Sequence, residues 1–193
     1  MKEYNISKNA WLDIDIYPWG CDYRPKTQAK IQKGSNGFEI TMKSYEKNIR
    51  MEKTERNSNV HTDSCMEFFF NAEPEKSKTY MNFEINPKGI MYIGFSKTGD
   101  RSGTGPIEAP DNEYFNMKSR ITDEYWEISY TVPYEFIKQY FPTFDENKTE
   151  YIKANFYKCG DLTKHPHFGV WNNIETEEPD FHRPEFFGVI NLR

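Results

Sequence analysis

The stretch from Cys65 to Asn86 constrains the fold of this chain most, because it contains two runs with the patterns of β-strands. The second run, YMNFEIN, alternates apolar and polar side chains, and successive side chains of a strand point to opposite faces of a sheet. The first run, CMEFFFN, is rich in Phe, which also favours strands. We expect the two runs to pair as antiparallel strands, with their bulkier faces in the core.

The polar face of these two runs is unusual in its chemistry. Tyr80, Asn82, Glu84 and Asn86 share one face of the second run, and Glu67 lies on the corresponding face of the first. This face has no Lys or Arg, and amides and carboxylates offer the hydrogen-bond donors and acceptors that neighbouring sugar hydroxyls require. A half-buried antiparallel strand also turns a polar face to water without any function. The pattern therefore predicts a shallow polar patch and leaves its role open.

The rest of the chain predicts more strands and one helix. Further strands are expected at Phe38 to Lys43, Ile90 to Phe95, Tyr125 to Val132, Tyr151 to Lys158 and Phe186 to Leu192, with a polar strand or connection at Asn48 to Asn59. Pro133 opens a helix that runs to about Phe141, and Pro142 stops it. Lys97 to Asn112 reads as a long surface loop that borders a binding site.

These elements predict the fold class. We expect an all-β protein, an antiparallel β-sandwich of jelly-roll or immunoglobulin-like type with one short helix. At 193 residues, without an internal repeat or a linker, the chain fits a single domain over residues 1–193. Aromatic residues are 17% of the chain against 36% hydrophobic residues in total, so the core must be built largely from Phe and Tyr.

Charge and cysteine content argue against several function classes. The net charge is -5 and the basic residues are scattered, which argues against nucleic acid and an anionic membrane as partners. Three cysteines without a CxxC spacing support neither a disulfide framework nor a zinc knuckle. No run is long and apolar enough to be a leader or a membrane span, so we expect a cytoplasmic protein.

Several segments together resemble one known family. They are VHTDSCMEFFF with YMNFEINPKG, then WEISYTVP, then ANFYKCGD, and the tail PDFHRPEFFGVINL. In this order they resemble carbohydrate-binding module family 9 and its single-domain relatives. The resemblance implies a sandwich that binds mono-, oligo- or polysaccharides without catalysis, in carbohydrate catabolism, by clamping a sugar ring between aromatic side chains. It also implies structural calcium in some members.

The resemblance also implies roles for particular residues. Glu67 matches a Glu that bonds sugar hydroxyls, Asn86 matches an Asn of the next strand, and Trp171 matches one jaw of the aromatic clamp. At the other jaw this chain has His61 where the family has Trp. With the polar neighbours of these positions, the predicted ligand-binding residues are His61, Glu67, Glu84, Asn86, Asn155, Trp171 and Asn172. We assign no catalytic residue and no metal ligand.

Two other interpretations remain open. Glycoside hydrolysis uses two carboxylates about 5 to 9.5 Å apart, so Glu67 and Glu84 could serve a glycoside-processing enzyme. The chain could also be a sandwich that has lost its ligand and acts as an interaction module. His165, His167 and His182 lack the spacing of a zinc site, so structural roles are favoured for them.

Overall fold

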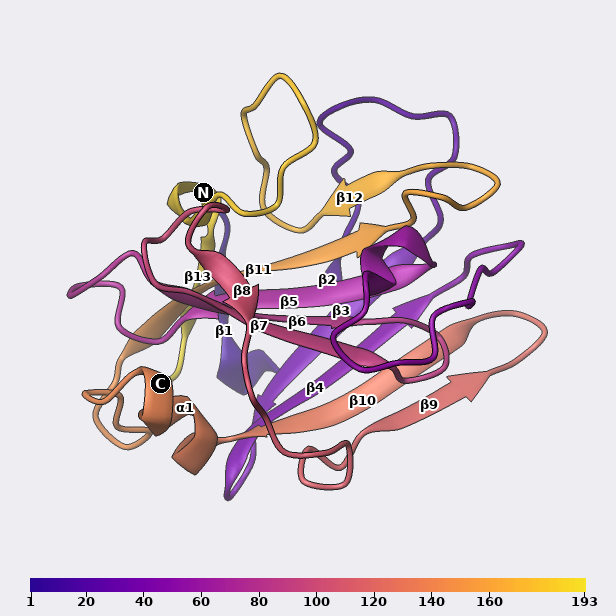
Figure 1. Cartoon of the computed structure of the whole chain (residues 1–193). Coiled ribbons are helices and arrows are strands. Elements are labelled where there is room, and N and C mark those ends of the chain that lie inside the picture. The colour runs from indigo at the N-terminus through magenta and orange to yellow at the C-terminus, as the bar shows by residue number, and fades with distance from the viewer.

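The computed structural model describes residues 1–193 as two β-sheets packed face to face (Figure 1). The first sheet has the strand order β1-β13-β11-β5-β6-β7-β8, and β12 also pairs with β11. Its strands are β1 (Glu3–Asn5), β5 (Cys65–Asn71), β6 (Tyr80–Ile85), β7 (Met91–Ser96), β8 (Thr104–Pro106), β11 (Tyr151–Cys159), β12 (Phe168–Val170) and β13 (Gly188–Asn191).

The second sheet has the order β2-β3-β4-β10-β9. Its strands are β2 (Leu12–Asp13), β3 (Thr27–Lys33), β4 (Gly37–Ser44), β9 (Lys118–Ile121) and β10 (Trp126–Pro133). The helix α1 (Tyr134–Tyr140) follows β10 directly, and three short 3-10 helices complete the fold: η1 (Ile6–Lys8), η2 (Val60–Thr62) and η3 (Pro184–Phe186). The predicted β-sandwich with one short helix is confirmed, and neither that helix nor any other is long and apolar enough to span a bilayer.

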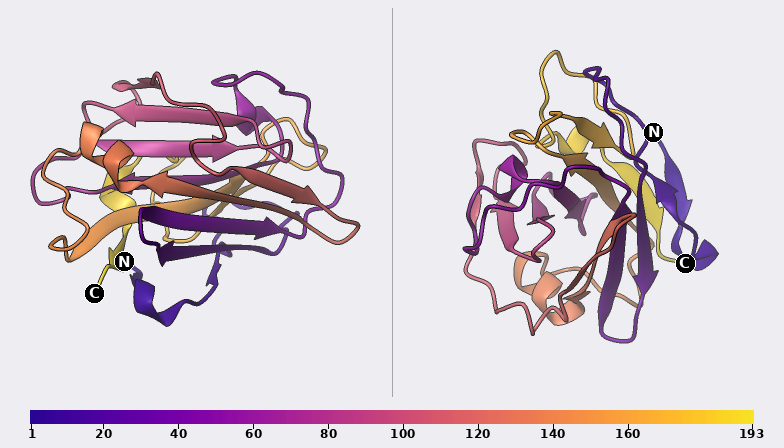
Figure 2. Two further views of the ribbon diagram at one scale, coloured as in Figure 1. Left: turned by 90° about the horizontal axis from the view of Figure 1, so that it is seen from below. Right: turned by 90° about the vertical axis from the view of Figure 1, so that its right-hand side faces the viewer.

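The central pair of strands has the predicted antiparallel pairing. β5 and β6 are antiparallel, with Glu67 directly opposite Glu84 and Phe68 opposite Phe83. The bulkier face of β5 points into the core between the sheets, where the ring of Phe68 stacks on Phe70 at 5.0 Å and on Phe156 at 4.8 Å. The aromatic core expected from the composition therefore lies between the two sheets, and the right-hand view of Figure 2 shows these two layers of strands end-on.

The polar face of this pair is buried too, which differs from the shallow solvated patch that we predicted. All residues of β5 and β6 are buried. The reason is that the segment before β13 returns across the outer face of the sheet. There the ring of Phe181 stacks on Tyr157 at 4.2 Å, and the Tyr157 hydroxyl donates to the Phe181 carbonyl. Phe187 packs edge-on against Tyr80 in the same outer cluster. This cover turns an open face into the floor of a cavity.

Three other segments refine the predictions. Residues 48–59 form a connection rather than a strand. β3 and β9 were missed, and all four residues of β9 are exposed on an edge that pairs only with β10, so burial left no pattern in its sequence. The loop Lys97 to Asn112 contains the short strand β8, which closes the edge of the first sheet beside β7.

A closed network of charged side chains lies inside the sandwich, between β11 and the end of β4. The Lys158 ammonium lies 3.0 Å from the Glu46 carboxylate and donates to His167 Nε2 at 2.8 Å and to the Cys159 carbonyl at 2.7 Å. Ser64 and Trp126 donate to the same carboxylate. Every N–H of the ammonium has an acceptor, so this network links the sheets without needing a ligand.

Candidate functional site

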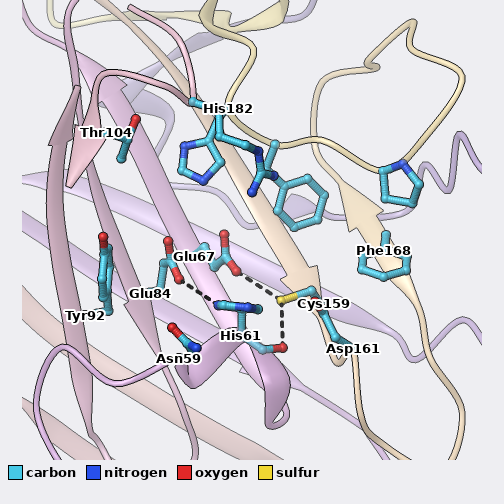
Figure 3. A pocket seen from close by; sticks show the side chains of 13 residues that line it. Asn59, His61, Glu67, Glu84, Tyr92, Thr104, Cys159, Asp161, Phe168 and His182 are labelled. Atoms are coloured by element: carbon cyan, nitrogen blue, oxygen red, sulfur yellow. Dashed lines mark hydrogen bonds and ion pairs between the residues drawn. The ribbon is translucent and has the colours of Figure 1, made fainter. Parts of the chain in front are cut away.

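A cavity of about 270 Å³ opens on the outer face of the first sheet, away from the core (Figure 3). It lies where β5, β6, β7 and β11 are crossed by η2, the loop before β8 and the segment before η3. Thirteen residues line it: Asn59, His61, Glu67, Glu84, Tyr92, Arg101, Thr104, Cys159, Asp161, Phe168, Pro179, Phe181 and His182. The lining combines carboxylates, an amide, two imidazoles and aromatic rings.

Two buried carboxylates form the floor. Glu67 is 2% exposed and Glu84 is 6% exposed, and their positions on β5 and β6 make them direct cross-strand neighbours. Glu67 Oε1 accepts a hydrogen bond from the Cys159 thiol at 3.0 Å, and Glu84 Oε1 accepts one from the Asn82 amide at 2.9 Å. No protein group donates a hydrogen bond to the second oxygen of either carboxylate, and Figure 3 shows both side chains at the centre of the cavity lining.

His61 stands over this floor. Its Nδ1 atom is 3.8 Å from Glu84 Oε2, and its side chain is 41% exposed. The short helix η2 that carries it is fixed from the far side, because the Asp161 amide donates to the His61 carbonyl and the Leu162 amide donates to the Thr62 carbonyl, both at 3.2 Å. These two hydrogen bonds fix η2, so the imidazole is held at the mouth of the cavity.

The opposite wall consists of Phe168, Phe181 and His182. The His182 ring is fixed by a 2.7 Å hydrogen bond between its Nδ1 and the Tyr80 hydroxyl. Trp19 supports the two Phe rings from behind, with ring centroids 6.4 Å from Phe168 and 6.0 Å from Phe181. The two Phe rings make part of this wall apolar, whereas the floor is acidic, which gives the cavity one face for C–H groups and another for hydroxyls or amines.

Comparison with known proteins identifies the family. The family model for carbohydrate-binding family 9 matches residues 3–192. The chain belongs to this family. No curated protein matches the sequence significantly.

Solved structures support the fold of this family 9 chain. A Bacteroides uniformis ATCC 8492 protein to which carbohydrate binding is ascribed is similar with a TM-score of 0.81 and 26% identity, over 96% of this chain and 87% of that chain. A family 9 module of Caldicellulosiruptor kristjanssonii in complex with cellotriose has a TM-score of 0.65 at 10% identity, over 98% of this chain and 93% of that one. The structure with glucose gives the same TM-score and identity, over 98% and 95%. At 10% identity these two matches show the fold.

The environment of the family 9 cavity shifts the pKa values of both floor carboxyls upwards. Burial and the neighbouring Glu84 raise the pKa of Glu67 well above its usual range. Burial raises the pKa of Glu84 to about 7, although the hydrogen bond from Asn82 opposes the shift. Burial lowers the pKa of His182 to about 4, so this imidazole is neutral at pH 7. Loss of hydration thus acts on every ionisable group of the floor and the wall, with no cation at bonding distance to offset it on the carboxylates.

Three of the seven predicted binding residues line this cavity, namely His61, Glu67 and Glu84. Trp171 does not. It is 3% exposed and belongs to the main core, where it packs edge-on against Phe156 at 6.1 Å. A Cβ atom on Gly188 would lie 2.6 Å from the Trp171 ring, so β13 needs a glycine there to pass the indole. The structure therefore gives Trp171 a packing role.

The three predicted amides also lie outside the cavity. Asn86 is fully buried and uses its whole side chain locally: it donates to the Lys53 carbonyl and to Asp63, and it accepts from the backbone amides of Lys88 and Ile90.

The side chains of Asn155 and Asn172 are also used for hydrogen bonds to nearby backbone groups. The Asn155 amide donates to the Asn172 carbonyl, and its oxygen accepts from the Asn172 backbone amide. Asn172 in turn accepts from the Lys2 amide and donates to the Phe186 carbonyl. Asn172 therefore joins the N-terminal segment to the tail, and Asn155 ties it to β11.

Ten lining residues were not predicted as binding residues, and most come from the loops around the sheet. Arg101 and Thr104 belong to the loop that we expected to border a binding site, and this loop lines the cavity. Phe181 and His182 belong to the tail that carries the family resemblance, so the resemblance had marked their segment without marking their roles. Asp161 lies in the turn after β11 and Phe168 begins the short strand β12, and the sequence offers no local signal for either position.

One group of side chains could hold a metal ion. The ligand atoms of Cys65, Glu67 and Cys159 lie within 4.8 Å of one another, and all three residues are buried. Two thiols and one carboxylate are softer donors than the six to eight oxygens that calcium takes. This donor set does not fit calcium, and we derive no calcium site from it.

Proposed function

We propose that this family 9 chain binds the end residue of a glycan, or a free mono- or oligosaccharide, in the cavity above Glu67 and Glu84. The observation that carries the proposal is the pair of buried carboxylates, each with one oxygen free of protein partners and facing the cavity. Sugar hydroxyls donate to such oxygens, and hydrogen bonds to a charged group contribute about 1.5 to 3 kcal/mol.

The size and lining of the cavity support a small sugar. Sites for drug-sized ligands usually measure roughly 300–1,000 Å³, and this cavity of about 270 Å³ is smaller. It suits one or two sugar rings, whose C–H patches can lie against Phe168, Tyr92 or the exposed face of His61. The relatives of known structure in complex with glucose and cellotriose are consistent with ligands of this size.

The arrangement favours binding over hydrolysis. A glycosidase needs its two carboxyl groups on either side of the scissile bond. Here both carboxyls rise from adjacent positions of one sheet face, so a sugar above them would meet both from the same side. The raised pKa of Glu84 is nevertheless a property of glycosidase acids, and hydrolysis of aryl glycosides by the wild type should be assayed beside binding.

The test is a calorimetric screen against a panel of mono- and disaccharides, with wild type, Glu67→Gln and Glu124→Gln. Glu124 is exposed in the turn before β10, so its variant changes the net charge equally and leaves the cavity intact. We expect Glu67→Gln to weaken the best ligand by about 10- to 100-fold, since the charge-assisted bond becomes a neutral one. Binding in all three proteins with equal affinity would contradict the assignment, and silence of the wild type across the panel would favour an interaction module.

A further inference from the structure

The cavity has more acidic than basic groups. The titratable and charged side chains that line it or border it are Glu67, Glu84, Asp161, Asp180, His61, Arg101, His182, Tyr92 and Cys159. Arg101 contributes the guanidinium, but it is engaged by Asp180, with Nη2 2.9 Å from the carboxylate. His182 is held neutral by burial, since its pKa falls to about 4. Arg101 still acts on Glu84 and Asp161 from a distance, and the basic side chain that comes within ion-pair distance of the floor is His61.

His61 does not donate a hydrogen bond to the free oxygens of the floor carboxylates. His61 Nδ1 lies 3.8 Å from Glu84 Oε2, which is beyond hydrogen-bond distance, and its ring is 41% exposed to solvent. Glu67 has no basic partner within ion-pair distance, although only 2% of its surface is exposed. Both side chains are more than nine-tenths buried and each presents an oxygen without a protein partner to the cavity. An acidic pair of this kind points to a ligand that supplies positive charge as well as hydrogen bonds.

We propose that the sugar recognised here is an amino sugar with a free ammonium group, such as a 2-amino-2-deoxyhexose, which sits with its ammonium over Glu67 and Glu84. The inference rests on the proposed function and names the class of sugar. A neutral hexose can donate hydroxyl hydrogen bonds to the same oxygens but supplies no charge that would hold the two neighbouring carboxyls in their ionised form. An ammonium supplies three donors and the missing charge at once.

The chemistry also predicts which derivative the cavity rejects. N-acetylation removes the charge of the amine and adds bulk, so an N-acetylhexosamine loses the interaction with the pair. The cavity is small, at about 270 Å³, and its apolar wall of Phe168 and Phe181 is rigidly supported by Trp19. The acetyl group would therefore have to fit against the acidic floor or leave the cavity.

The test compares matched sugars by calorimetry at pH 7. The probes are glucose, glucosamine and N-acetylglucosamine, and the corresponding galactose series. In whichever series binds, we expect the free amine to bind at least tenfold more tightly than the neutral hexose, which corresponds to about 1.4 kcal/mol, and more tightly than the N-acetyl sugar. Glu84→Gln should reduce the ratio of amine to hexose affinity several-fold, while the exposed Glu124→Gln should leave this ratio as in wild type.

The possible results separate the inference from the proposed function. A hexose that binds as tightly as its amine overturns the amino-sugar inference and leaves sugar binding in place. Absence of binding by every probe overturns both. If Glu84→Gln does not fold, Asp161→Asn provides the second test, because its carboxylate lines the same cavity from the loop after β11 and is only partly buried. An unchanged affinity ratio in the variant that folds overturns the inference.

Discussion

Two groups of buried ionisable side chains lie on opposite faces of the first sheet, and they differ in how the unfavourable free energy of removing charge from water is offset. Inside the sandwich, Lys158, Glu46 and His167 form a network in which each ammonium N–H finds an acceptor. On the outer face, Glu67 and Glu84 each keep one oxygen without a protein partner. The first group is complete within the protein, whereas the second leaves two oxygens to groups from outside it, such as solvent or the proposed sugar.

The protonation states follow the same division. Burial and then the adjacent Lys158 lower the pKa of His167 to about 4, so its ring is neutral. Its Nδ1 donates to the His165 carbonyl and its Nε2 accepts from the ammonium. The outer pair has no such partner, and the pKa values of both carboxyls rise instead. The difference teaches that a buried charge indicates a binding site when its partners are missing, rather than simply because it is buried.

The largest expected effect comes from breaking the closed network. Lys158→Met leaves the Glu46 carboxylate buried without its cation, which should lower the free energy of unfolding by about 3 to 5 kcal/mol. Urea unfolding at pH 7 measures this change. The double variant Lys158→Met/Glu46→Gln removes both charges and should recover most of the loss. A single variant within about 1 kcal/mol of wild type would show that the network is not the closed system described here.

The second effect is a dependence of stability on pH that arises in the open pair. The unfolded chain loses the Glu84 proton near pH 4.5, but the folded chain keeps it until about pH 7. Between these values the folded state binds more protons, so the free energy of unfolding falls as the pH rises, by an amount on the order of 3 kcal/mol. The raised pKa of Glu67 acts in the same direction.

The measurement is urea unfolding of wild type and Glu84→Gln at several pH values from 4 to 8. His167 and His182 titrate in the opposite sense, because their lowered pKa values make stability rise with pH between about 4 and 6.5. The difference between the two proteins isolates Glu84. We expect the free energy of unfolding to fall less between pH 5 and pH 8 in Glu84→Gln than in wild type. If the two proteins show the same change with pH, the pKa of Glu84 is not raised in the folded state.

Much of the fold could be predicted from the sequence because strand periodicity survives on any strand with one buried face. Alternation within two runs placed Glu67 and Glu84 on the same face of the sheet, and the structure adds the register that sets them directly opposite. The exposed strand β9 left no pattern, because neither of its faces is buried. The covering of the outer face could not be predicted, since it depends on the tail crossing strands that are about a hundred residues earlier in the chain.

The site was partly predictable for the same reason. Glu67 and Glu84 lie on strands, so the two-residue alternation of side chains predicted which face they join. Both line the cavity. Trp171 is a tryptophan, as the clamping aromatic of the family is. The residue type does not specify on which face of the sheet the side chain lies, and this side chain lies in the core. Loop residues such as Asp161 depend on contacts between distant segments, which alternation does not describe.

The third effect concerns the ligand and the rim of the open site. His61 is exposed and lies outside the closed network, so His61→Ala should leave the unfolding midpoint nearly unchanged. It should weaken sugar binding by about 2- to 10-fold, because a ring against a sugar face contributes roughly 0.5 to 1.5 kcal/mol. Calorimetry with the best ligand checks this, and His61→Trp, which enlarges the ring, should bind more tightly. Equal affinity in all three proteins would remove His61 from the site.

The smallest change is expected for Cys159→Ser, which tests whether the Cys159 side chain matters to Glu67 as a hydrogen-bond donor or through its sulfur. Its hydrogen bond to Glu67 Oε1 satisfies one of the four oxygens of the floor. Cys159→Ser keeps a donor of similar size, so affinity should stay within about threefold and stability within about 1 kcal/mol of wild type. Cys159→Ala removes the donor and leaves another unpaired buried oxygen, which should cost about 1 to 3 kcal/mol of stability. The outer pair already has few hydrogen-bond partners. If Cys159→Ala loses stability and Cys159→Ser does not, the hydrogen bond to the carboxylate matters to this site, and the chemistry of the thiol does not. Equal losses in both variants would instead point to the sulfur itself and to the group formed by Cys65, Glu67 and Cys159.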